Sequence, residues 1–129
     1  MKFEPLNKDT AEKALLEQEY AKAHVIGKLR IGDSVLFLRV RMKTYYIPFS
    51  SIRRCFRRVR IVHAGGCCGG SSLAIENMVI CDESGELAEL QMPGEKAGKS
   101  ALEEMQKKMP HVIFTAPMKK NEMEEEPSK

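Results

Sequence analysis

The chain has no tryptophan, no long apolar run and, over residues 34–75, no acidic residue. A membrane-spanning helix needs about 20 consecutive apolar residues, so the sequence excludes such a helix. The first residues also lack the apolar segment of a signal peptide. We therefore expect a cytoplasmic protein whose four cysteines stay reduced and form no disulfide framework.

Patterns that mark catalytic sites are missing as well. The sequence contains no G-x-S-x-G, P-loop or H-E-x-x-H pattern. Its three histidines, His24, His63 and His111, stand apart, without a carboxylate or nucleophile at a useful spacing. We expect a protein that is not an enzyme and that holds no cofactor.

The chain of 129 residues is long enough for one domain with a hydrophobic core. Residues 9–24 predict a helix that opens with a capping box at Asp9 and Glu12. Its apolar stripe is narrow, so we expect it to pack outside the core or against a second copy. About six short strands with short connections follow, and residues 94–109 then predict an amphipathic helix that stops at Pro110.

The stretch "YYIPFSSIRRCFRRVRI" (45–61) combines an aromatic strand, a corner that ends at Ile52 and a further strand. With the run of hairpin strands and the final helix, residues 27–109 resemble the small bacterial pleckstrin-homology-like (PH-like) proteins. The resemblance implies an α+β fold in which an antiparallel barrel or bent sheet of about six to seven strands is capped by helix 95–109. We expect an N-terminal helix within 1–24, the PH-like domain at 25–117 and a charged, disordered tail at 118–129. Unlike eukaryotic PH domains, the closing helix has no tryptophan, and residues 111–116 predict an added strand.

The acid-free stretch concentrates positive charge. Its eight cations are Arg39, Arg41, Lys43, Arg53, Arg54, Arg57, Arg58 and Arg60. Period-two alternation places Leu36, Leu38, Val40 and Met42 on one face of a strand, and Phe37, Arg39, Arg41 and Lys43 on the other. In lipid-binding PH-like proteins, basic residues around the first hairpin hold headgroup phosphates, which is what the resemblance implies for Arg39, Arg41 and Lys43. The alternative is that the arginines pair with acids elsewhere, including Glu86, Glu89 and Glu124–Glu126.

Residues 63–72, "HAGGCCGGSS", raise the question of a metal or redox site. His63, Cys67 and Cys68 have side chains that bind zinc, and Cys55 or Cys81 would have to complete a set of four ligands. Adjacent cysteines share one ion poorly, and the paired glycines are typical of a hairpin loop. We expect a loop, with a Cys/His metal site as the alternative that remains open.

These observations favour a non-enzymatic binding module whose basic face engages an anionic protein segment or a phosphorylated headgroup. Aromatic residues make up only 6% of the chain, which argues against nucleic acid as the partner. Peripheral contact with a membrane remains open. Self-association through helix 9–24 or a free strand edge is the competing hypothesis.

Overall fold

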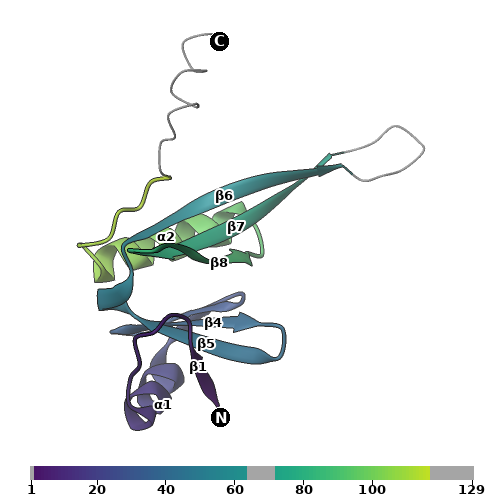
Figure 1. Cartoon of the computed structure of the whole chain (residues 1–129). Helices are drawn as coiled ribbons and strands as arrows, with labels where there is room; N and C mark the ends of the chain where they lie inside the picture. Colours follow the sequence, from purple (N-terminus) through teal and green to yellow (C-terminus); the bar gives the residue numbers. More distant parts are fainter. Residues whose placement is uncertain (1, 64–71, 117–129) are drawn as a thin grey trace.

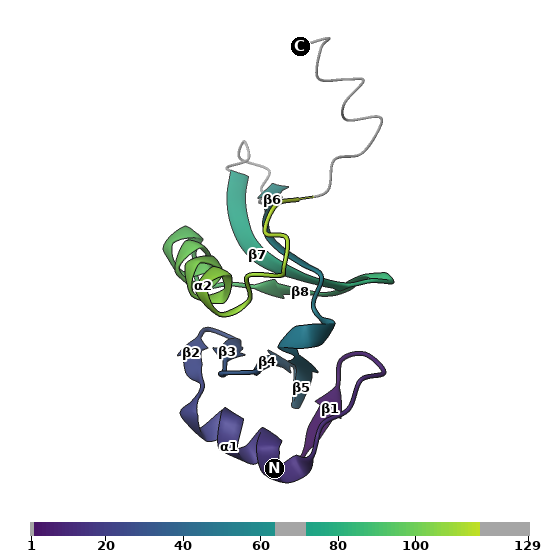
Figure 2. The ribbon, with the colours of Figure 1, turned by 90° about the vertical axis from the view of Figure 1, so that its left-hand side faces the viewer.

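A computed structural model describes residues 2–63 and 72–116 of the chain. Figure 1 and Figure 2 show two sheets, one above the other, with one helix at each level. The elements are β1 (Phe3–Pro5), α1 (Lys13–Lys22), β2 (His24–Ile26), β3 (Leu29–Ile31), β4 (Val35–Val40), β5 (Lys43–Pro48), η1 (Phe49–Ser51), β6 (Arg54–His63), β7 (Ser72–Asp82), β8 (Gly85–Gln91) and α2 (Glu95–Lys108).

The first sheet has five strands in the order β1-β5-β4-β3-β2. Strands β2 to β5 form an antiparallel meander, and β1 joins β5 in parallel. Leu36 and Leu38 point toward α2 and the second sheet, whereas Val35 and Phe37 belong to a separate cluster with α1. Because helices cover both faces, β4 is buried from Val35 to Leu38 without alternation.

The second sheet has three strands in the order β6-β7-β8. Strands β6 and β7 pair over their whole length, from Arg54↔Cys81 to His63↔Ser72. Strand β8 pairs with β7 only from Asn77 to Asp82. The hairpin therefore continues beyond the sheet as a two-stranded ribbon, residues 59–63 and 72–76, which we call the arm (Figure 1).

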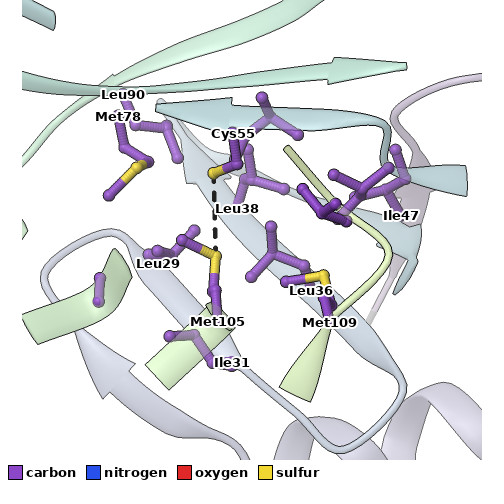
Figure 3. Close-up of a cluster of buried hydrophobic side chains, with 14 of the residues drawn as sticks. Leu29, Ile31, Leu36, Leu38, Ile47, Cys55, Met78, Leu90, Met105 and Met109 are labelled. Carbon is purple, nitrogen blue, oxygen red and sulfur yellow. Dashed lines mark hydrogen bonds between the residues drawn. The ribbon is translucent and has the colours of Figure 1, made fainter. Parts of the chain in front are cut away.

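The main core lies between the two sheets and α2 (Figure 3). The buried stripe of α2 contains Gly98, Ala101 and Met105, as its helical spacing predicts. Met105 Sδ lies 4.0 Å from the Cys55 thiol, and both side chains are completely buried. The C-terminal amphipathic helix predicted from the sequence is thus present and covers the core.

Helix α1 lies on the opposite face of the five-stranded sheet. Leu16 packs against Phe37 and Tyr46, and the Tyr20 ring lies 5.2 Å from that of Phe37 in an edge-on arrangement. The buried Glu19 accepts hydrogen bonds from the backbone of the 33–34 turn. This polar contact fixes the helix to the sheet although its apolar stripe is weak.

Three details of the predicted architecture need correction. The described strands number eight, in two sheets that do not close into a barrel. The helix predicted over 9–24 is shorter at both ends and spans Lys13–Lys22. Asp9 accepts a hydrogen bond from the Ser51 hydroxyl instead of capping the helix, and His24 already belongs to β2. The strand expected after α2 is a single bridge between Arg54 and Ile113.

No helix in the described part of the chain has the length and apolar character to cross a membrane. The tail predicted at 118–129 lies outside the described residues.

Candidate functional site

The structure divides the eight predicted cations into groups with different partners. Arg57, on β6, binds the buried carboxylate of Glu76, its neighbour on β7. A second carboxylate, that of Glu95 at the start of α2, lies 3.7 Å away. The hydrogen bond to Glu76 raises the pKa of Arg57, so this cation is neutralised by the protein itself.

Arg58 and Arg60 are also paired, on the other face of the three-stranded sheet. Arg58 lies 2.5 Å from Glu86 and 3.0 Å from Glu89. Arg60 lies 2.5 Å from Glu89, which also accepts a hydrogen bond from Asn77. The hydrogen bonds from Arg60 and Arg58 lower the pKa of Glu89 to about 2. The sequence named internal pairing as the alternative for these arginines, and the structure shows it on β6.

Arg53 and Arg54 hold backbone carbonyls. Arg53 donates to the Ser50 carbonyl at 2.8 Å, and Arg54 donates to the Thr115 carbonyl at 2.5 Å. These bonds attach the corner before β6 and the chain after α2. The two side chains therefore link neighbouring segments of the fold.

The prediction that Arg39, Arg41 and Lys43 line one face of a strand is wrong. Strand β4 ends at Val40, and Arg41 and Met42 form the turn to β5. Met42, predicted to face the core, is 87% exposed. Arg41 has a φ of 57°, in the left-handed region that costs most non-glycine residues roughly 1 kcal/mol. The three cations surround a turn instead of lining a strand.

Two further cations belong to this place and were missed in the sequence. Strand β3 pairs with β4 in the register Leu29↔Leu38, which puts Lys28 beside Arg39. The Arg39 N–H donates to the Lys28 carbonyl at 2.8 Å. Gly27, which has a φ of 62°, marks the turn from β2 to β3 that contains Lys28, and the apolar residues on either side make this β2–β3 hairpin predictable.

A shallow cavity of about 140 Å³ lies among these side chains. Its lining residues are Tyr20, Val25, Gly27, Lys28, Arg30, Phe37, Arg39 and Thr44. The Arg30 guanidinium lies over the Tyr20 ring, 4.1 Å from its centre. Thus three cations and two hydroxyl-bearing residues border one small hollow on the α1 side of the sheet.

We call Lys28, Arg30, Arg39, Arg41 and Lys43 the turn cluster. Within residues 2–63 and 72–116, none of the five forms an ion pair. Four of them are exposed, and Arg30 is half-buried. The turn cluster is therefore a concentration of charge that the described residues leave uncompensated.

Two cysteines and two histidines of the described residues are buried or have structural contacts. Cys55 and Cys81 are buried free thiols, and burial raises the pKa of both. His24 Nδ1 lies 2.5 Å from a Glu104 carboxylate oxygen, and His111 Nε2 lies 2.9 Å from the Phe49 carbonyl oxygen.

The predicted metal alternative centred on His63, Cys67 and Cys68. His63 ends β6, while Cys67 and Cys68 lie outside the described residues. In the part of the chain that the structure describes, no group of three or more ligating side chains is placed to hold a metal ion.

A family model described as a domain of unknown function (DUF6709) matches residues 2–123. The chain belongs to the DUF6709 family. The match begins before β1 and ends beyond α2, so both sheets and both helices lie within it. Neither the curated proteins nor the solved structures contain a match to this member of the family.

Proposed function

We propose that this DUF6709 protein is a non-enzymatic binding module that takes an anionic partner at the turn cluster. The observation that carries the proposal is the contrast in pairing. Every cation of β6 beyond Arg54 has a carboxylate partner, whereas in the described residues the five cations of the turn cluster have none. Exposed guanidinium groups bind carboxylates and phosphates with two parallel hydrogen bonds, which gives such a site its chemistry.

The backbone of Arg41 supports the same conclusion. A two-residue hairpin turn normally places glycine or asparagine at a positive φ. Arginine occupies this position and presents a long exposed cation at the tip of the hairpin. Strain of this kind is found where a side chain serves a function.

The PH-like interpretation is part of the proposal. It is supported by the order of the elements, in which hairpin strands in two sheets are followed by the amphipathic helix α2. We also place the function in the cytoplasm, and the free thiols of Cys55 and Cys81 support this location.

The test is a binding titration with three anionic probes: a poly-glutamate peptide, an oligonucleotide, and phosphatidylcholine vesicles that contain phosphatidylserine. Wild-type protein is compared with the double variant Arg39→Glu/Arg41→Glu. We expect the variant to bind the preferred probe at least about tenfold more weakly, because two attractive charges become repulsive. Binding by the wild type should weaken as salt is added.

The matched control is Lys13→Glu/Lys107→Glu, which makes the same change in net charge at two exposed residues of the helices. It should bind as the wild type does. Equal weakening in both variants would show a non-specific charge effect and contradict the proposal. If no probe binds and sedimentation of the full chain shows a stable dimer, self-association is the function instead.

A further inference from the structure

The arm carries apolar side chains that the described structure leaves about half exposed. Val59, Ile61, Val62 and Leu73 are 49%, 58%, 45% and 60% exposed. They make up half of the large hydrophobic side chains that are exposed among the described residues. Isolated exposed apolar residues are ordinary, but four on one short ribbon indicate a contact surface.

These side chains point to both faces of the ribbon. Residues directly opposite in an antiparallel pair share a face, and neighbours along a strand alternate. Val59 and Ile61 therefore point to one face, whereas Val62 and its partner Leu73 point to the other. A flat protein surface covers only one face of a ribbon, whereas a medium that surrounds the ribbon covers both.

The distribution of charged residues indicates which kind of surface surrounds the arm. At the base of the arm, Arg60 is paired with Glu89 and Glu76 with Arg57. The other described residues of the arm, 59, 61–63 and 72–75, contain no acidic residue, lysine or arginine. The β4–β5 turn and the arm lie on the same side of the molecule, with the arm at the level of the second sheet (Figure 1), because β5 runs away from Lys43 and β6 returns. An apolar projection on the same side of the molecule as uncompensated cations is complementary to a lipid surface with anionic headgroups.

We propose that the arm inserts into an anionic lipid bilayer while the turn cluster contacts its headgroups. This inference rests on the proposed function and names its partner as a membrane surface. Insertion is shallow, because β8 does not pair with the arm and its strand edges need water to satisfy their backbone groups. The arm therefore reaches the interfacial layer and does not cross the hydrocarbon core.

The first experiment removes the apolar character and keeps the strand. The variant Val59→Thr/Ile61→Thr/Val62→Thr/Leu73→Thr retains high β-propensity at four exposed sites. We expect it to bind phosphatidylserine-containing vesicles at least about tenfold more weakly than the wild type, because less apolar area is buried on insertion. Its circular dichroism spectrum should match that of the wild type.

The control variant is Leu15→Gln/Ile113→Thr, which removes exposed apolar side chains outside the arm. It should bind the vesicles as the wild type does. Equal binding by the threonine variant and the wild type would overturn the inference. If, in that case, Arg39→Glu/Arg41→Glu still abolishes binding, the turn cluster remains the site and only the role of the arm is wrong.

The second experiment measures insertion directly. The chain has no tryptophan, so Leu73→Trp introduces a single indole on the arm. We expect its emission to shift to the blue when phosphatidylserine-containing vesicles are added, and Ile113→Trp to show no shift. A blue shift that follows protein concentration without lipid would show that a second copy covers the arm, and would overturn the inference.

Discussion

The arginines on β6 and the cations at the β4–β5 turn come from one basic stretch of sequence, yet their surroundings differ. On β6, cross-strand neighbours on β7 and β8 supply Glu76, Glu86 and Glu89. At the turn, Thr44 lies opposite Arg39 and Val40 lies opposite Lys43. Glu4 on β1 lies opposite Tyr45, but it forms no ion pair with the turn cluster among the described residues. Whether a charge on a strand is neutralised thus depends on which residues the register places across from it. A charge at a turn stays uncompensated when no carboxylate pairs with it.

This comparison assigns different roles to residues of the same type. Arg57 and Arg58 join strands within the second sheet, and Arg57 also lies near Glu95 of α2, so removing either arginine leaves carboxylates of the fold without their cation. Arg39 and Arg41 are free of carboxylates in the described part of the chain, so their removal costs the fold little. Changes in each region should therefore separate loss of stability from loss of binding.

The largest expected effect is at Arg57. Arg57→Leu leaves the carboxylate of Glu76, which is only 7% exposed, without its cation. We expect the free energy of unfolding to fall by about 3 kcal/mol, as for a broken buried pair. Arg41→Leu should change it by less than about 0.5 kcal/mol. Urea denaturation measures both values.

The double variant Arg57→Leu/Glu76→Leu is the control for this interpretation. Replacing both members of a buried pair by apolar residues removes the uncompensated charge, so much of the lost stability should return. If the double variant is less stable than Arg57→Leu alone, burial of charge is not the cause of the loss.

A smaller effect is expected at Gly98, which makes room for the same pair. A Cβ at this position would lie 2.6 Å from a carboxylate oxygen of Glu76. Replacing a helical glycine by alanine normally stabilises a protein by up to about 1 kcal/mol. Here we expect Gly98→Ala to destabilise it by about 2 kcal/mol, because Arg57 holds the carboxylate in place.

Whether Gly98→Ala stabilises or destabilises the protein should depend on the residue at position 76. In a Glu76→Ala protein the obstacle is gone, so Gly98→Ala should become stabilising. Thermal unfolding of the four proteins in this cycle provides the measurement. A destabilising Gly98→Ala in both backgrounds would show that the helix packs too closely for reasons unrelated to Glu76.

The next effect depends on pH. The pKa of Glu89 is lowered from 4.5 to about 2 in the folded protein, so this group stabilises the fold above its unfolded pKa. That contribution is lost as the pH falls through about 4.5 toward 2. We expect a loss of roughly 1 kcal/mol, because solvent screens its partner Arg60. Glu89→Gln should unfold with a flatter pH dependence in this range.

Asp82 gives a comparison for the acid profile, because its pKa is also lowered, by the Ser84 hydroxyl, and it has no arginine partner among the described residues. Adding salt should weaken the contribution of Glu89 more than that of Asp82. Equal salt sensitivity would contradict the assignment of the Glu89 shift to its ion pairs.

The elements themselves were predictable wherever local patterns decide them. The stripe of Ala101 and Met105 predicts α2, and the glycine at 85 predicts the β7–β8 hairpin. The prediction of one buried face for β4 was partly wrong. Helix α1 covers the side that alternation assigns to solvent, and Phe37 is buried there. Alternation describes one buried face and fails when a helix covers the second.

The candidate site depends on register, which the sequence does not contain. Arg57 and Glu76 are 19 residues apart, and only the pairing of β6 with β7 makes them neighbours. Likewise Lys28 joins Arg39 only because β3 and β4 pair through Leu29 and Leu38. The basic stretch was visible from its composition, but which of its members are neutralised follows from long-range pairing.

The smallest expected change in stability is at Arg41, where stability and binding should change in opposite directions. Arg41→Gly relieves a left-handed backbone that costs arginine roughly 1 kcal/mol, and the greater freedom of glycine in the unfolded chain offsets part of this gain. We expect the protein to become more stable by roughly 0.5 kcal/mol while it binds its anionic partner more weakly. Lys43→Gly removes the same charge from extended β5, so it should weaken both stability and binding.

If Arg41→Gly stabilises the protein without weakening binding, the strained arginine does not serve the site. If both variants lose binding while their stabilities move in opposite directions, the charge at the turn serves binding and not the fold.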